Sequence, residues 1–150
     1  MTTVQTTTET ELKPFSFNYG DYPVTLEPYD WAPQAHSSVM ITMGGTKLLV
    51  VLCVGKQSNP DIDFTALTVN YTEKFYSVGK IPGSYFKREG RPTEHEILIC
   101  RLIDRSFRPL FPAHFHDEMH FTVQLLAFDK KNSPDVGTLA ILAASATMAI

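Results

Sequence analysis

The run Thr-Lys-Leu-Leu-Val-Val-Leu-Cys-Val at residues 46–54 decides the fold class. It is apolar at nearly every position and rich in valine, which predicts a strand buried on both faces at the centre of a sheet. A second β-rich run covers residues 34–42, and Met43-Gly44-Gly45 lies between the two. Two such runs around a Gly-Gly pair are typical of a β-hairpin.

Further strands are predicted on both sides of this hairpin, at residues 22–27, 64–74 and 119–128. In the second of these, Leu67 and Tyr71 share one face because side chains alternate along a strand. Residues 1–20 are Thr-rich and acidic, so we expect an N-terminal tail there and a single domain over residues 21–150.

A helix is predicted to begin at the capping box Thr93-x-x-Glu96 and to end at Arg108-Pro109. Its inward face is expected to consist of Ile99, Leu102, Ile103 and Ser106. The order of elements is strands, helix, strand, helix, which indicates an α+β fold with a mixed sheet.

The last helix is expected to start with Ser133 as its cap and Pro134 in its first turn. Residues 136–150 are almost entirely apolar or small, but the run is shorter than the ~20 residues of a membrane span. It also stops without a capping residue. We therefore expect a buried helix cut in mid-course, a domain truncated at its C-terminus, and no contact with membranes.

Composition is ordinary for a globular domain, with 43% hydrophobic and 19% charged residues and a net charge of −3. This balance argues against a uniformly basic nucleic-acid binder. Cys53 and Cys100 lie in apolar runs, which predicts buried free thiols in a reducing compartment. Residues 1–12 lack the features of a signal peptide, so a cytoplasmic location is expected.

Positive charge gathers in residues 74–108, where eight basic side chains face four acidic ones, a local balance of 8 − 4 = +4. The loop Tyr85-Phe86-Lys87-Arg88 places two rings beside two cations, so it could stack on bases and hold phosphates. These rings could equally be core residues and the cations simply solvated.

Three arginines follow at helical spacing: Arg101, Arg105 and Arg108. They share a face, and Arg91 lies just before the helix. Guanidinium groups suit phosphate because their planar fork makes paired hydrogen bonds. Asp104 could instead neutralise them in a structural network, so both a phosphate-binding and a structural role stay open.

These segments resemble a known family. Residues 81–92 (IPGSYFKREGRP) and 93–112 (TEHEILICRLIDRSFRPLFP) are very similar to consecutive segments of bacterial polynucleotide phosphorylases. Residues 63–71 (DFTALTVNY) and 132–135 (NSPD) resemble the same family, in the same order. The resemblance runs from about residue 24 to residue 150.

The resemblance implies an RNase PH-type domain, the first of two in enzymes that degrade single-stranded RNA and mRNA from the 3′ end. These nucleotidyltransferases use inorganic phosphate as co-substrate, release nucleoside diphosphates and form trimeric rings. Their Mg²⁺-binding carboxylates and catalytic groups belong to the second such domain, so no catalytic or metal-binding residue is expected in this fragment. The resemblance also implies a homotrimer, and an RNA-degradation complex with RNase E and a helicase.

Carried over by position, the resemblance assigns RNA contact to Tyr85, Phe86, Lys87, Arg88 and Arg91. The chain departs from the family pattern, which has Phe-Phe-Arg-Arg in this loop. Lys87 keeps the charge there but loses the bidentate fork.

The other departure is at residues 26–35, where the family reads Leu-Glu-Thr-Gly-x-x-Ala-Arg-Gln-Ala. Pro28 and Pro33 mark this change, which alters the turn and puts a subunit or RNA contact in question.

Other candidate sites are weaker. His114, His116 and His120 form a cluster that could bind a metal, but a surface loop is the expectation. Asp61 and Asp63 have no nucleophile nearby, and Trp31 is expected to pack rather than to bind a ligand. Two functions remain: part of a phosphorolytic exoribonuclease, or a non-catalytic RNase PH-like subunit that only binds RNA in a ring.

Overall fold

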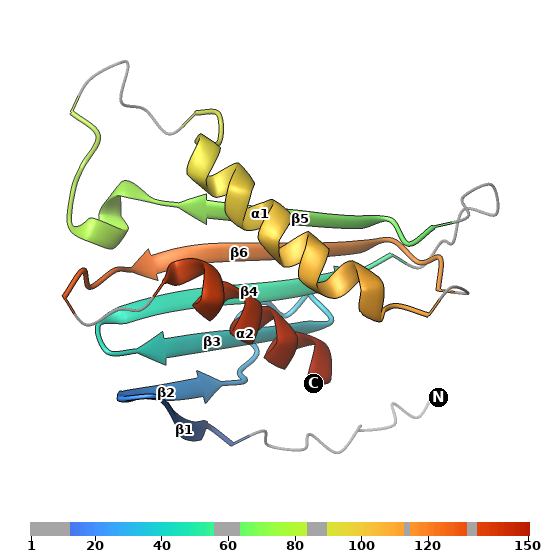
Figure 1. The fold of residues 1–150 in the computed structure, drawn as a ribbon, viewed down its shortest axis with the longest axis horizontal. Coiled ribbons are helices and arrows are strands. Elements are labelled where there is room, and N and C mark those ends of the chain that lie inside the picture. The colour runs from blue at the N-terminus through green and yellow to red at the C-terminus, as the bar shows by residue number, and fades with distance from the viewer. Residues whose placement is uncertain (1–12, 56–63, 84–89, 113–114, 132–134) are drawn as a thin grey trace, which may run out of the picture.

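A computed structural model describes residues 13–55, 64–83, 90–112, 115–131 and 135–150. Within these ranges the chain forms a six-stranded sheet with two α-helices on one face (Figure 1). The strands are β1 (Phe15–Tyr19), β2 (Tyr22–Glu27), β3 (Ser37–Met43), β4 (Thr46–Val54), β5 (Leu67–Glu73) and β6 (Met119–Ala127). The helices are α1 (Glu94–Phe107) and α2 (Val136–Ala149), with 3-10 turns η1 (Phe75–Val78) and η3 (Arg108–Leu110).

The strand order is β1-β2-β3-β4-β6-β5. All neighbouring strands are antiparallel except β5 and β6, which are parallel and joined through α1. The expected mixed sheet with helices is therefore confirmed. Because β5 and β6 run the same way, their carboxyl ends meet at one edge of the sheet, and the starts of α1 and α2 lie at this edge as well (Figure 1).

The predicted hairpin is β3–β4, which turns at Gly44-Gly45 with Met43 opposite Thr46. Gly44 has a φ of 57°, a conformation that side chains with a Cβ disfavour. A Cβ on Gly45 would lie 2.7 Å from the Cβ of Asp129, so the second glycine allows a close approach to the end of β6.

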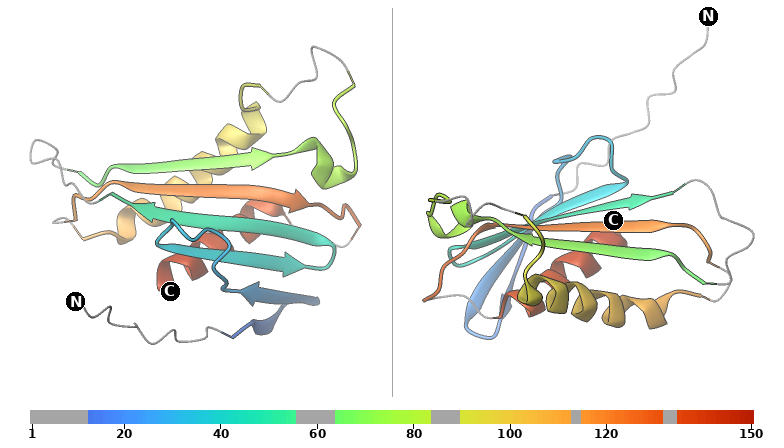
Figure 2. Two further views of the ribbon diagram at one scale, coloured as in Figure 1. Left: turned by 180° about the vertical axis from the view of Figure 1, so that it is seen from behind. Right: turned by 90° about the horizontal axis from the view of Figure 1, so that it is seen from above.

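The core lies between the sheet and the two helices, which cover the same face (Figures 1 and 2). Leu48, Val50 and Leu52 of β4 point into it and are buried. On the other face Leu49 and Val51 are only half-buried. The expectation that this strand is buried on both faces was therefore wrong, because in the described chain both helices cover one side.

The reverse face of the sheet is partly covered by the segment that follows β2 (Figure 2). Ser38 of β3 donates a hydrogen bond to the carbonyl of Tyr29 and accepts one from the backbone N–H of Trp31. The Trp31 ring meets the Tyr29 ring edge-on at 5.9 Å and keeps 48% of its surface exposed. Trp31 therefore packs against Tyr29, within the stretch where the chain departs from the family pattern.

Part of the expected N-terminal tail forms a strand. β1 pairs antiparallel with β2, and Tyr19 lies opposite Tyr22 across a two-residue turn at Gly20-Asp21. Gly20 has a φ of 60°, which suits such a turn. The Gly-Asp pair between aromatic residues was the available signal, and the Thr-rich composition of the preceding residues concealed it.

The capping box of α1 is confirmed. Thr93 accepts a hydrogen bond from the N–H of Glu96, and the Glu96 carboxylate accepts one from the N–H of Thr93. The helix ends at Phe107, as the following Arg-Pro step predicts. Its buried residues are Glu96, Ile99, Ile103 and Phe107.

The predicted inward face of α1 was wrong in two positions. Leu102 is 44% exposed and Ser106 is exposed. The face is rotated toward Phe107, whose ring stacks on that of Phe121 at a centroid distance of 5.8 Å. The buried ring of Phe107 therefore belongs to the face of α1 that packs on the sheet.

The cap of α2 is Asp135 and not Ser133, which lies outside the described residues together with Pro134. The Asp135 carboxylate accepts a hydrogen bond from the N–H of Thr138. Both Ser and Asp make good caps, so the sequence offered two possible starts and local preference did not separate them.

Both cysteines are free thiols. Cys100 is half-buried and its sulfur accepts a hydrogen bond from the N–H of Tyr71 at 3.2 Å, and burial raises the pKa of this thiol. Cys53 is exposed, contrary to expectation, because it points to the reverse face of β4.

Candidate functional site

The loop expected to contact RNA lies largely outside the described residues. This applies to Tyr85, Phe86, Lys87 and Arg88, while Arg91 is described and exposed. The chain leaves η1, passes through this loop and returns at α1.

Arg101 and Arg105 lie on the outer face of α1, one turn apart, and both are exposed. They point away from the core because Ile99 and Ile103 occupy the inward face of the same turns. Among the described residues, neither arginine has an acidic partner within bonding distance. Their charge is therefore available to an external anion.

Arg108 has a structural role. Its guanidinium makes two hydrogen bonds to the Asp104 carboxylate, at 2.6 and 3.1 Å, and donates a third to the carbonyl of Thr65 at 3.2 Å. The hydrogen bond to Asp104 raises the pKa of Arg108. The three arginines thus do not act alike: Arg108 ties the end of α1 to the segment before β5.

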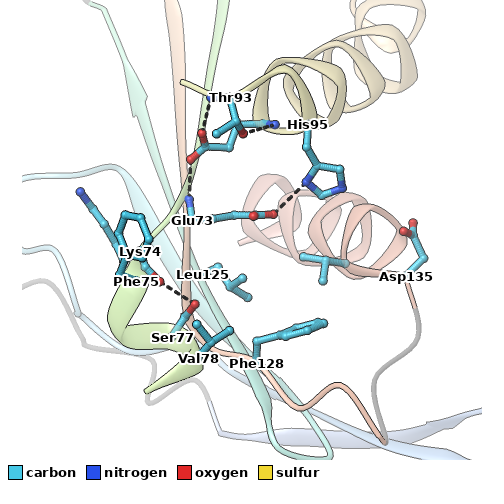
Figure 3. Close-up of a pocket in the computed structure, with 12 residues that line it drawn as sticks. Glu73, Lys74, Phe75, Ser77, Val78, Thr93, His95, Leu125, Phe128 and Asp135 are labelled. Atoms are coloured by element: carbon cyan, nitrogen blue, oxygen red, sulfur yellow. Dashed lines mark hydrogen bonds and ion pairs between the residues drawn. The ribbon is translucent and has the colours of Figure 1, made fainter. Parts of the chain in front are cut away.

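A pocket of about 600 Å³ opens at the carboxyl ends of the parallel strands (Figure 3). η1, the start of α1 and the start of α2 surround it. Its lining residues are Glu73, Lys74, Phe75, Ser77, Val78, Thr93, His95, Glu96, Leu125, Phe128, Asp135 and Val136. The edge where parallel strands end is where α/β folds commonly bind ligands.

Glu96 organises one wall of the pocket. Its carboxylate accepts hydrogen bonds from the N–H of Glu73 at 2.7 Å and of Thr93 at 2.6 Å. Desolvation by burial acts to raise the pKa of Glu96, but the hydrogen bonds from Glu73 and Thr93 outweigh it, and the pKa is lowered. Glu96 is therefore a buried carboxylate held in its charged form by backbone donors.

Glu73 and His95 form a second polar group in this wall. The Glu73 carboxylate accepts a hydrogen bond from the Tyr71 hydroxyl at 2.8 Å and lies 3.0 Å from Nδ1 of His95 (Figure 3). Burial, and then the hydrogen bond to Glu73, raise the pKa of Tyr71, so its hydroxyl remains a donor. Among the described residues, Nε2 of His95 has no hydrogen-bond partner.

The opposite wall is apolar. Leu125 and Phe128 lie across the pocket from Glu73 and His95, and Val78 lies beside them (Figure 3). A cavity with one apolar wall and one polar wall suits a flat organic molecule with a polar edge.

Sequence reasoning missed this pocket. Glu73, His95 and Asp135 come from three separate elements, which the pairing of β5 with β6 and the packing of both helices bring together. Glu73 at the end of a strand and Asp135 at the start of a helix were the features of the sequence that could have indicated the pocket.

Of the histidine cluster, His120 pairs with Glu118 at 3.0 Å, and the buried Nδ1 of His116 has no hydrogen-bond partner among the described residues. His114, Asp61 and Asp63 lie outside the described residues. Within the described ranges no three His, Cys, Asp or Glu side chains gather in a way that could hold a metal ion. No described helix is long and apolar enough to span a membrane.

Residues 22–150 match the sequence model of the 3′ exoribonuclease family, domain 1. The polyribonucleotide nucleotidyltransferase of Pelagibacter ubique is 49% identical over 127 residues, and that of Desulfotalea psychrophila is 47% identical over 128. Each alignment covers 85% of this chain but 18% of the relative. The chain thus spans under a fifth of the length of these relatives.

Two solved structures share the fold, both with a TM-score of 0.62. The Archaeoglobus fulgidus exosome with RNA bound to the active site is 20% identical, with 83% of this chain and 50% of that chain covered. Rice Rrp46 is 14% identical, with 85% and 55% covered.

Proposed function

Because the chain belongs to the 3′ exoribonuclease family, we propose that it is the N-terminal part of a phosphate-dependent 3′-to-5′ exoribonuclease and supplies RNA contacts to it. The RNase PH-like α+β fold expected from the sequence is confirmed by the family match and by the mixed sheet. The relatives that share almost half of its residues are named polyribonucleotide nucleotidyltransferases. The activity we propose is therefore phosphorolysis of single-stranded RNA to nucleoside diphosphates.

The observation that carries the RNA-contact role is the pair of exposed arginines on α1. Arg101 and Arg105 have no acidic partner in the described chain, in contrast to Arg108. Together with Arg91 and the cations of residues 84–88 they supply positive charge in a chain whose net charge is negative. Such a confined basic stretch suits the phosphates of one RNA strand.

The aromatic residues of the same loop fit this role. Tyr85 and Phe86 directly precede Lys87 and Arg88 in the sequence, so the two rings would stack on bases of a single strand while the two cations contact its phosphates. Contacts of this kind are tolerant of sequence, as a processive nuclease requires.

We assign the catalytic groups of the proposed exoribonuclease to other parts of the full-length protein. We place the carboxylates that would hold Mg²⁺ in a second RNase PH-type domain, as the family resemblance implies. Inorganic phosphate would act as the nucleophile there. We extend the proposal to a homotrimeric ring in the cytoplasm, in which this domain lines the path of the RNA.

The test is a degradation assay with the full-length protein and a 5′-labelled single-stranded RNA. We expect shortening from the 3′ end that requires inorganic phosphate and yields nucleoside diphosphates. Release of nucleoside monophosphates without phosphate would contradict phosphorolysis. RNA binding in a ring-sized oligomer without any degradation would favour the alternative, a non-catalytic RNase PH-like subunit.

A further inference from the structure

We propose that the pocket between η1, α1 and α2 binds an amino-bearing nucleobase, stacked on Phe128 with its polar edge toward Glu73 and Asp135. If the base belongs to an RNA strand, this inference rests on the function proposed above. A free nucleoside would make the same contacts, and its binding would not depend on the function proposed above.

The size of the pocket fits such a ligand. Its volume of about 600 Å³ lies within the range of roughly 300–1,000 Å³ that small-molecule sites occupy. Secondary structure defines it on several sides, because η1, the end of β6 and the starts of both helices contribute lining residues.

The apolar wall offers a surface for stacking. In Figure 3 the Phe128 side chain lies near Leu125 and Val78, on the side of the pocket away from His95. Bases of any kind stack on aromatic rings, and the exposed faces of a base are apolar while its edge is polar.

The charges in the pocket argue against an inorganic anion. Three carboxylates, Glu73, Glu96 and Asp135, line it with one lysine, Lys74. The free N–H groups at the start of a helix can bind an anion. Here carboxylates of the protein itself already accept hydrogen bonds from N–H groups at the starts of α1 and α2. Glu96 accepts from the N–H of Thr93, and Asp135 accepts from the N–H of Thr138.

Acceptor oxygens remain for the ligand. Both hydrogen bonds to the Glu73 carboxylate use Oε1, and both to the Asp135 carboxylate use Oδ2. Among the described residues, Oε2 of Glu73 and Oδ1 of Asp135 therefore lack a hydrogen-bond donor. Carboxylates pair with the amino groups of cytosine and guanine, so these bases should bind better than uracil, which has no amino group.

The experiment measures the affinity of the full-length protein for guanosine, cytidine and uridine by calorimetry, with no RNA or phosphate present. We expect guanosine and cytidine to bind and uridine to bind at least tenfold more weakly. Asp135→Asn should weaken the binding of guanosine at least tenfold, since Asn keeps the helix cap but replaces the carboxylate. Asp30→Asn is the matched control, because Asp30 is exposed and outside the pocket lining.

A second variant, Phe128→Leu, keeps an apolar side chain but removes the ring, and should weaken all the nucleosides that bind. The melting temperature of each variant shows whether a loss of binding reflects a loss of folding. If Asp135→Asn unfolds, Glu73→Gln provides the same test at the other carboxylate of the proposed site.

Three results would overturn the proposal: no nucleoside binds, all three nucleosides bind equally, or inorganic phosphate binds while nucleosides do not. Displacement of guanosine by a single-stranded oligonucleotide supports an RNA base as the occupant. Failure of displacement supports a free nucleoside. Because nucleoside affinity is measured apart from RNA degradation, either proposal can fail while the other stands.

Discussion

Glu96 shows how one residue of this chain serves both folding and the shape of the pocket. It is 7% exposed, yet it is charged, because backbone N–H groups of β5 and of the helix cap both donate to it. A buried carboxylate with such partners stabilises the fold in its ionised form. The capping-box pattern predicted the hydrogen bond from the N–H of Thr93 to Glu96, but not the one from the N–H of Glu73, which is distant in sequence.

Replacing Glu96 with Gln should lower the free energy of unfolding by about 1.5–3 kcal/mol at pH 7, the range for hydrogen bonds to charged groups. Since folding lowers the pKa of Glu96, its contribution is present above the ordinary value of 4.5 and is lost as pH falls through the lowered pKa. Urea denaturation at pH 7 and at pH 3 measures this. The deficit of Glu96→Gln should shrink at pH 3.

Glu94→Gln is the control for this experiment, since Glu94 is exposed in the same turn of α1. It should change stability little at either pH. A deficit of Glu96→Gln that is the same at both pH values would show that shape, and not charge, explains the effect.

Substitutions at Arg105 and at Arg108 should have different effects, one on RNA binding and the other on stability. Arg108→Ala should destabilise the domain by about 0.5–1 kcal/mol, a modest value because the pair with Asp104 is partly exposed. Arg105→Ala should leave stability unchanged and weaken RNA binding. Thermal melts and RNA titrations of both variants check this, and equal effects of the two on RNA affinity would contradict the distinction.

At the scale of elements, the start of α2 is packed tightly against α1. A Cβ on Gly137 would lie 2.9 Å from the capping oxygen of Asp135 and 3.1 Å from Leu102. In a helix, Ala in place of Gly ordinarily stabilises by ~0.5–1 kcal/mol. Here the cap would be displaced, which costs about 0.5–2 kcal/mol.

Gly137→Ala should therefore be neutral or destabilising in the natural chain, and stabilising once Asp135→Ala has removed the cap. A double-mutant cycle of unfolding free energies measures the coupling between the two positions. Additive effects would show that the methyl group is accommodated without moving the cap.

Elements with strong local patterns were predicted well. β4 has the predicted bounds, and α1 begins at its capping box. β1 was missed because its hairpin follows a Thr-rich stretch, and the α2 cap was misplaced because Ser133 and Asp135 are both good caps. Local sequence indicates that an element exists more reliably than where it starts.

At the scale of the whole molecule, the parallel pairing of β5 with β6 was not predictable from the residues. It depends on the path of α1 across the sheet, and together with the packing of α2 on β3, β4 and α1 it brings Glu73 and Asp135 to one pocket. By contrast, the arginines of the candidate RNA surface lie in one continuous stretch. The sequence could therefore identify them, although it could not separate Arg108 from Arg105.

We expect this domain to hold RNA through its confined basic stretch. The direct test is the salt dependence of single-stranded RNA affinity for the full-length protein and its Lys87→Ala/Arg88→Ala variant. Each lost phosphate contact should reduce the slope of log affinity against log salt by about 0.7, so we expect a reduction of roughly 1.4 together with weaker binding.

Lys130→Ala/Lys131→Ala is the matched control, because it removes two exposed charges outside that stretch. For this control we expect the slope of log affinity against log salt to equal that of the unchanged protein. Equal slopes and affinities for both double variants and the unchanged protein would contradict it.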